Sequence, residues 1–258
     1  MVRRAAQENY SLESIDRMAA ILTALEEAPE QSLEQLARAS GLNESTALRY
    51  LLSLGKHEIV ERNETTGRFR LGLSLFRLGM RSVAYRDVVT LSLPAMERLL
   101  AQFGESVNLA ARQQGQVVLL KVLDGAASGR KGARPGEADP WHATSLGKAL
   151  LAEMPPEDVV ALVGNEPLAG FTPTTLQQHE DLIKDLQRTA ARGYSIDDEE
   201  SVEGLRCVGA GIRDYDGVAR YAISVSGPKS RMPYLRLEEI GQVITRAAAD
   251  VAKALGAH

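Results

Sequence analysis

The sequence SLEQLARASGLNESTALRYLLSLGKHEIV, residues 32–60, decides the fold of the first part of the chain. In residues 33–37 the two leucines and the alanine recur at helical spacing, which predicts a short amphipathic helix. Gly41 allows the left-handed backbone that often ends a helix. Asn43 can then cap the start of the next helix with its side-chain oxygen. The stretch therefore predicts two helices joined by a tight turn, followed by a strand.

A hairpin is predicted directly after these helices. Residues 59–62 and 68–71 have strand character, and the second strand alternates basic and apolar side chains. Between them, residues 63–67 form a turn in which Gly67 can adopt a positive φ. Two helices alone usually form an ordinary helical hairpin. Followed by a basic-edged hairpin, they predict a winged helix-turn-helix.

Polar residues near the start of the second helix are candidates for contact with DNA. A helix-turn-helix that binds DNA inserts this part of its second helix into the major groove. The candidates are Ser45, Thr46 and Arg49 on the helix and Arg62, Arg68 and Arg70 on the wing. These arginines have to share one side of the domain, with the acids of the first helix pointing away. We expect sequence-specific contact, because a net charge of −4 argues against non-specific coating of nucleic acid.

The composition limits the class of protein. A length of 258 residues predicts about two domains, and a hydrophobic content of 44% supports a substantial core. No apolar run approaches the ~18–20 residues that span a membrane, and the first residues lack the apolar centre of a signal peptide. Cys207 is the only cysteine, so an intrachain disulfide is impossible. We expect a cytoplasmic protein without a membrane partner.

The two domains are predicted to be joined by a linker helix. Apolar residues at helical spacing predict helices over 14–28, 73–85 and 88–103. Pro94 either kinks the last of these or starts a further helix. We therefore expect a first domain over residues 1–72, a linker over 73–87 and a second domain over 88–258.

The second domain is predicted to be an antiparallel sheet flanked by helices. The predicted strands are 106–112, 116–123, 194–200, 207–214 and 219–226, and the predicted helices are 145–154, 156–163, 175–192 and 234–255. The strands come in hairpins rather than alternating with helices, which predicts an α+β fold class. Residues 125–139 are rich in Gly, Ala, Arg and Pro and should form a loop with at most one short strand.

A candidate anion site lies where WHATSLGKALLA passes from loop to helix. Thr144 or Ser145 can cap this helix, which leaves the amide N–H groups of Ser145 and Leu146 open to a ligand. An ordinary capped helix is the commoner meaning of such a sequence. The Gly-Lys pair lacks the other residues of a phosphate-binding loop, so nucleotide binding is not expected.

Four further residues have both an ordinary and a ligand-binding interpretation. Ser224 and Ser226 share one face of a strand, which either faces solvent or lines a polar cavity. Asp197 belongs to an acidic run that is usually a surface feature. Cys207 is most often a small buried filler.

The sequence offers little support for catalysis or for a metal. An enzyme could use Ser145, His142 and Asp197, but no G-x-S-x-G motif or dinucleotide fingerprint is present. The other histidines, His57 and His179 among them, do not lie at metal-ligand spacing. We therefore expect a hydrogen-bonding role for His142, and no catalytic residue, metal or cofactor.

The order of elements and several local strings resemble the isocitrate-lyase-regulator (IclR) family of bacterial transcription factors. The strings are GLNESTALRYLLSLGKHEIV, GRFRLGLSLFRLG, WHATSLGKALLA, GYSIDDEESVEGLRCVGAGIRD and YAISVSGP, and the resemblance spans about residues 14–255. It implies a winged helix-turn-helix, a linker helix and a C-terminal GAF-like effector-binding domain with an antiparallel sheet. It also implies dimers or tetramers that bind operator DNA, as repressors or as activators.

The resemblance assigns roles to the candidate ligand residues. It implies that the effector carboxylate binds at Ser145 and Leu146. Asp197 points into the same pocket, Cys207 lies beside the ligand, and Ser224 and Ser226 complete the wall. We therefore expect a regulator whose operator binding is modulated by a small organic or aromatic acid. The alternatives are a ligand-independent dimerisation or partner-binding regulator and a hydrolase-like enzyme.

Overall fold

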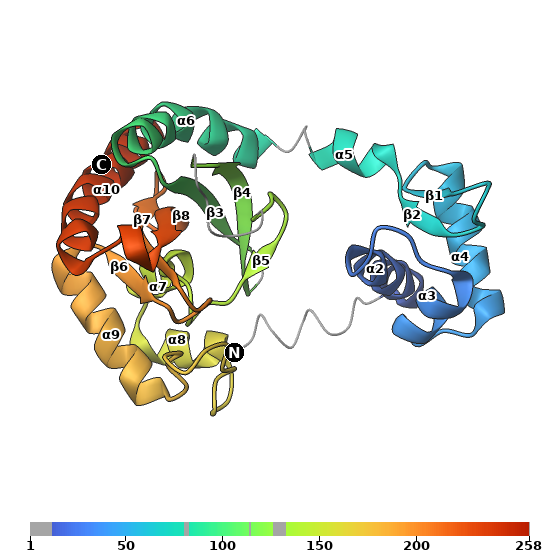
Figure 1. The fold of residues 1–258 in the computed structure, drawn as a ribbon. Coiled ribbons are helices and arrows are strands. Elements are labelled where there is room, and N and C mark those ends of the chain that lie inside the picture. Colours follow the sequence, from blue (N-terminus) through green and yellow to red (C-terminus); the bar gives the residue numbers. More distant parts are fainter. Residues whose placement is uncertain (1–11, 80–82, 114, 126–132, 258) are drawn as a thin grey trace. The chain divides into compact units, whose positions relative to one another are not determined.

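The computed structural model describes residues 12–79, 83–113, 115–125 and 133–257. The chain divides into two compact units, Met1–Val83 and Ala84–His258, each of which has its own core. Figure 1 shows the helices and strands of both units along the chain.

The first unit is a winged helix-turn-helix, as predicted. Its elements are α2 (Glu13–Glu26), α3 (Leu33–Ala39), α4 (Glu44–Lys56), β1 (Val60–Arg62), β2 (Phe69–Leu71) and α5 (Leu73–Gly79). Strands β1 and β2 pair antiparallel and form the wing. Ile21 of α2, Leu36 of α3, Leu51 of α4 and Phe69 of β2 meet in one buried cluster. A shared hydrophobic core therefore holds these helices together, in addition to the capping and turn residues that set their ends.

Local capping sets the ends of these helices. Ser32 and Gln35 form a reciprocal capping box at the start of α3. Gly41 adopts a φ of 68° in the turn between α3 and α4, as the sequence predicts. The Asn43 Oδ1 accepts from the amide of Thr46 at 2.8 Å and caps α4.

The helix predicted over residues 73–85 falls partly outside the described residues, which leave out residues 80–82. The structure describes α5 up to Gly79. The next helix, α6 (Val83–Phe103), begins before the predicted start at residue 88 and runs on through Pro94. Pro94 does not start a new helix, which settles one of the two alternatives left open by the sequence.

The second unit is built on a six-stranded sheet. The strand order is β5-β4-β3-β8-β7-β6, and each neighbouring pair is antiparallel. The strands are β3 (Ser106–Gln113), β4 (Gln116–Leu123), β5 (Ala138–Asp139), β6 (Ser195–Asp198), β7 (Leu205–Arg213) and β8 (Ala219–Pro228). The helices after α6 are α7 (Ser145–Leu151), α8 (Pro156–Val163), α9 (His179–Arg192) and α10 (Tyr234–Ala254), with a 3₁₀ turn, η2, at Lys229–Arg231. The predicted α+β class and antiparallel sheet are confirmed.

Helices pack on both faces of this sheet. Met96 of α6 and Ile240 of α10 belong to the cluster that contains Leu109 of β3. The next residue, Ala110, belongs to a second cluster, which contains residues of α7, α8 and α9. Successive strand residues point to opposite faces, so α6 and α10 cover one face while α7 to α9 cover the other (Figure 1).

The helix α9 begins four residues later than predicted. Thr175 lies in the preceding loop, where its Oγ1 donates to the carbonyl oxygen of Glu200 at 2.6 Å. Thr172 donates from its Oγ1 to the carbonyl oxygen of Glu199 at 2.7 Å. These bonds attach the loop to the turn after β6. Thr175 therefore makes a tertiary contact and does not form part of the first turn of the helix.

Candidate functional site

A small polar hollow lies between the sheet of the second unit and the start of α7. Its lining residues are Asn108, Asp139, Thr144, Ser145, Leu146, Asp197, Ser201, Cys207, Ser224 and Ser226. The structure thus brings together all six predicted ligand residues, which come from four separate stretches of the sequence. Their role in binding a ligand remains a prediction.

Strand register explains how distant residues reach the same wall. Ser226 of β8 lies opposite Cys207 of β7, and Cys207 lies opposite Asp197 of β6. On the other side of β8, Ser224 lies opposite Asn108 of β3. Directly opposed residues point to the same face of a sheet. Four neighbouring strands therefore present these side chains to the start of α7.

The start of α7 closes the hollow from above this face. Thr144 caps the helix, since its Oγ1 accepts from the amide of Gly147 at 3.1 Å. The first amides of any α-helix have no partner within the helix, and here they belong to Ser145 and Leu146. A Cβ at Gly147 would lie 2.2 Å from the carbonyl oxygen of Trp141. Glycine at this position lets the helix approach the preceding loop closely.

Asn108 and Ser201 are lining residues that sequence reasoning missed. The Asn108 Nδ2 lies 3.2 Å from the Ser224 Oγ and 3.1 Å from the Ser226 Oγ. The available signal was an amide side chain in the middle of an otherwise apolar and small-residue strand. Ser201 donates from its Oγ to the Asp197 Oδ2 at 2.6 Å. Asp139 also lines the hollow, and Thr144 was predicted only as a helix cap.

Asp197 is fully buried and is held by its own turn. Its Oδ1 accepts from the amides of Glu200 at 2.8 Å and Ser201 at 3.3 Å. Burial raises the pKa of Asp197, while the hydrogen bond from Ser201 and the charge of Lys148 act in the opposite direction. The acidic run is therefore not the solvated surface feature that composition alone would suggest, and its first carboxyl group shapes the wall of the hollow.

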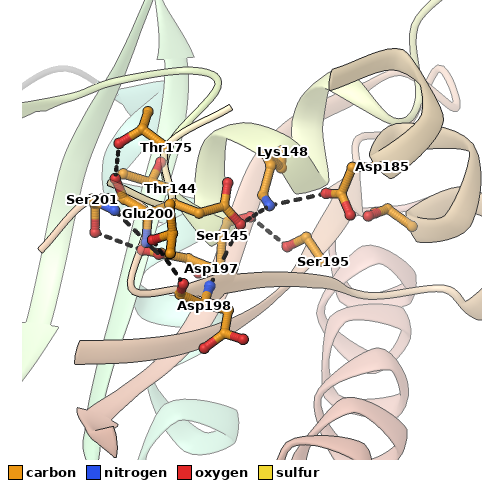
Figure 2. A network of polar contacts seen from close by, with 12 residues as sticks. Thr144, Ser145, Lys148, Thr175, Asp185, Ser195, Asp197, Asp198, Glu200 and Ser201 are labelled. Carbon is orange, nitrogen blue, oxygen red and sulfur yellow. Dashed lines mark hydrogen bonds and ion pairs between the residues drawn. The ribbon is translucent and has the colours of Figure 1, made fainter. Parts of the chain in front are cut away.

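A buried ammonium group lies directly behind this wall. Lys148 of α7 has no exposed side-chain surface, and its Nζ lies 2.6 Å from the Glu200 Oε1 and 2.9 Å from the Asp185 Oδ2. Figure 2 shows this lysine between Glu200 and Asp185, with Asp197 near Glu200. Lys148, Asp185 and Glu200 thus connect α7, α9 and the turn after β6.

The pKa of Glu200 is raised well above its ordinary value in this environment. Burial raises the pKa of Glu200 to about 7, and the charges of Asp197 and Asp185 add to this effect. Lys148 opposes it through its charge and its hydrogen bond. Two carboxylates that share one ammonium group cannot both be fully compensated in a buried site.

The free space between the lining side chains is small. Its volume is about 10 Å³, which is room for about one water molecule. A ligand larger than water therefore has to displace lining side chains or open the start of α7.

The candidate DNA contacts lie on the first unit. Ser45 and Arg49 are exposed on α4, and Thr46 is half-buried. All three wing arginines are exposed, but they differ in their partners. The Arg70 Nε and Nη2 lie 3.1 and 3.0 Å from the Glu61 Oε2, and Glu30 lies near the same guanidinium group. Arg70 is thus paired with a carboxylate of the wing itself, and neither Glu61 nor Glu30 belongs to the first helix.

Arg62 and Arg68 are less neutralised than Arg70. Arg62 donates from its Nε to the carbonyl oxygen of Gly67 at 3.3 Å, and its guanidinium group lies 5.8 Å from the centre of the Phe69 ring. Arg68 makes a long hydrogen bond of 3.5 Å to the carbonyl oxygen of Glu30. Neither contact involves a carboxylate, so both positive charges stay available on the wing.

The described ranges contain neither a metal-ligand cluster nor a membrane-spanning helix. In that part of the chain, histidine, cysteine, aspartate and glutamate do not form groups of three or more that could hold a metal ion. None of the helices described there combines the length and the apolar content needed to cross a membrane.

A winged helix-turn-helix joined to a domain with a small polar pocket defines a class of ligand-responsive DNA-binding proteins, and comparison with known proteins makes the class specific. Residues 14–64 match the IclR helix-turn-helix domain, and residues 80–253 match the bacterial transcriptional regulator IclR C-terminal domain. The chain belongs to the IclR family. It is a DNA-binding transcriptional regulator with an effector-binding domain, not an enzyme.

Relatives of known structure or name extend over nearly the whole chain. The HTH-type transcriptional repressor AllR of Salmonella typhi is 36% identical over 245 residues, which are 95% of this chain and 90% of that protein. An IclR homologue from Microbacterium hydrocarbonoxydans, solved with 4-hydroxybenzoate, is 26% identical at a TM-score of 0.82 over 94% of this chain and 99% of that one. A regulator from Silicibacter shares the fold at 23% identity, with a TM-score of 0.85 over 95% and 97% of the two chains.

The buried lysine leads to a first prediction. Lys148→Met leaves the buried Glu200 and the half-buried Asp185 without their shared cation, so the free energy of unfolding of the second unit should fall by about 3–5 kcal/mol. Urea unfolding followed by the fluorescence of Trp141, the only tryptophan, measures it. The control is Lys184→Met, which removes an exposed pair with Glu180 on α9 and should change stability little. Equal effects of the two substitutions would contradict the account.

Glu200 leads to a prediction about pH. Its pKa is raised in the folded protein, so the native state keeps the proton at pH values where the unfolded chain has lost it. Stability should therefore fall as the pH rises from about 4.5 to about 7. Glu200→Gln should reduce this fall in urea titrations at pH 5 and pH 7.5. Glu199→Gln is the neighbouring control, since the hydrogen bond from Lys229 lowers the pKa of its half-buried carboxyl group. An unchanged pH dependence in Glu200→Gln would refute the assignment.

Proposed function

We propose that this regulator binds operator DNA through residues 1–72, and that a short carboxylic acid bound in the second unit changes that binding. In this proposal residues 73–87 link the two functions, and residues 88–258 hold the effector. The observation that carries it is the convergence of Ser145, Leu146, Asp197, Cys207, Ser224 and Ser226 on one polar hollow.

The lining chemistry favours an anion at one end of the hollow. Amide N–H groups at a helix start attract negative charge, and the Ser224 and Ser226 hydroxyl groups add donors nearby. Asp197 repels a carboxylate while it is ionised, so the ligand's hydroxyl or carbonyl end belongs on its side. Burial of Asp197 favours its neutral form and reduces this repulsion. The polarity of the pocket therefore orients the acid.

The small size of the hollow favours a short acid, because fewer lining residues have to move for it than for an aromatic one. A volume of about 10 Å³ is far below that of pockets that enclose aromatic ligands. The Microbacterium relative binds 4-hydroxybenzoate, and an acid of that size would require several lining residues of this chain to move. We infer a short aliphatic effector, such as a 2-oxo acid.

DNA recognition is assigned to α4 and the wing. Arg49 is exposed on α4, and within the described part of the chain it has no hydrogen bond or ion pair to another residue. It is the residue most available to read a base or to bind a phosphate, with Ser45 and Thr46 beside it. Arg62 and Arg68 supply the wing contacts, whereas Arg70 has to leave Glu61 first. A DNA-binding regulator has to be in the same compartment as the DNA, so we infer a cytoplasmic location. The relative AllR is a repressor, which favours repression as the activity of this chain.

A homodimer or tetramer is part of the proposal. Paired helix-turn-helix units read two half-sites, which supplies the specificity that one unit lacks. Leu73, Phe76 and Leu78 expose large apolar side chains on the short helix α5, and exposed apolar patches commonly mark protein contacts. Light scattering at micromolar concentration should give at least twice the chain mass, and a monomer with and without DNA would rule the proposal out.

The effector site is tested by a serine substitution. Ser224→Ala removes a donor to a charged ligand and should weaken the binding of pyruvate or glyoxylate about tenfold or more, as measured by calorimetry. The control is Ser92→Ala, because Ser92 is a buried serine of α6 whose Oγ has no hydrogen-bond partner among the described residues. Wild-type affinity in Ser224→Ala would place the acid elsewhere.

DNA binding is tested by arginine substitutions. Arg49→Ala should weaken binding to a selected operator about 5–150-fold, the range expected for a base contact. Arg68→Ala should weaken all sequences similarly and lower the slope of affinity against salt by about one unit. The control is Arg98→Ala, an exposed arginine of α6 beside Asp250. If Arg49→Ala and Arg68→Ala both bind as wild type does, the recognition surface is misassigned.

A further inference from the structure

We propose that Asn108 is a positioning residue that determines which chemical groups the pocket accepts. It does so by turning the hydroxyl protons of Ser224 and Ser226 toward the ligand. This inference rests on the proposed function, and it adds a residue on β3 that selects the ligand without being one of the expected contacts.

The contacts of Asn108 fix the roles of both serines. An amide nitrogen carries two hydrogens and has no accepting lone pair. The Asn108 Nδ2 lies 3.2 Å from the Ser224 Oγ and 3.1 Å from the Ser226 Oγ, so it donates one hydrogen to each. All three residues are buried, with exposed fractions of 5%, 1% and 7%. Each serine oxygen is therefore an acceptor toward β3.

A hydroxyl group that accepts from one side has its own proton left for another partner. Within the described residues, neither Ser224 nor Ser226 makes a second side-chain hydrogen bond. Both serines line the hollow. Their protons are thus available to a ligand, and a ligand acceptor is the partner that completes the hydrogen bonding of this wall.

Two other hydroxyl groups of the hollow are already committed. Thr144 donates from its Oγ1 to the carbonyl oxygen of Pro140 at 2.8 Å. Ser201 donates to the Asp197 Oδ2 at 2.6 Å. Ser224 and Ser226 differ from these two, because they can donate to a ligand without losing a bond within the protein, and Ser145 at the start of α7 is the remaining lining hydroxyl group.

Two fixed donors side by side select for a group that only accepts. A carboxylate or a carbonyl oxygen fits them, whereas an ammonium group or the NH₂ of an amide would place donor against donor. Sites built around hydrogen bonds discriminate strongly against analogues that cannot form them. The amide of Asn108 is what keeps the two serines from rotating to suit such an analogue.

The test compares pyruvate with pyruvamide, which replaces one carboxylate oxygen by NH₂, in calorimetric titrations of the full chain. The wild type should bind pyruvate at least about tenfold more tightly. In Asn108→Leu the new side chain has a similar volume but cannot donate a hydrogen bond. The hydroxyl groups of both serines are then free to rotate. Pyruvate binding should weaken, and the preference for pyruvate should shrink. Asn108→Thr has a side chain that suits a strand and can donate to one serine only, so its preference for pyruvate over pyruvamide should be intermediate. This variant replaces Asn108→Leu in the test if the leucine variant does not fold.

A double-mutant cycle shows whether Asn108 acts through the serines. Adding Asn108→Leu to the Ser224→Ala and Ser226→Ala double variant should weaken pyruvate binding little further, because the groups that Asn108 orients are already gone. Additive losses, or an equal weakening of pyruvate and pyruvamide, would show a merely structural role and overturn the inference alone. A wild type that binds no small acid would overturn the proposed effector site and this inference together.

Discussion

The buried ammonium group of Lys148 holds the pocket of the second unit together. It lies on α7, whose first amides face the hollow, and it reaches Asp185 on α9 and Glu200 after β6. The backbone of Glu200 in turn donates to Asp197, which lines the hollow, and accepts from Thr175. A change in the position of α7 is therefore transmitted to α9 and to the acidic turn. Isolated buried charges are costly, so such a group persists only where its partners stay in place.

This arrangement links ligand binding to movement. The hollow has room for about one water molecule, and a short acid at the start of α7 has to displace its surroundings. The buried pair of Lys148 and Glu200 resists small independent shifts of α7. A ligand that moves this helix is thus expected to move the connected elements with it. Binding alters function only if the ligand favours one arrangement of the regulator over another, and a connected wall provides a physical route for that preference.

The parts of the fold with local signals were predictable from the sequence. The capping by Asn43, the positive φ of Gly41 and the wing are properties of neighbouring residues, and the strand boundaries follow from alternation. The six ligand candidates lie together as the family resemblance implied. Asn108 and the partners of Lys148 were missed because their roles depend on strand pairing and helix packing between segments far apart in sequence.

In the proposed mechanism, an acid bound to the second unit changes the affinity of the first unit for DNA. The most direct measurement is fluorescence anisotropy of a selected operator titrated with the full chain, with and without saturating pyruvate or glyoxylate. Coupling between two sites is typically ~1–3 kcal/mol, so the account predicts a change in operator affinity of about 5–150-fold. Linkage requires that operator DNA change the affinity for the acid by the same factor. An operator affinity that stays the same when the acid is shown to be bound would contradict the account.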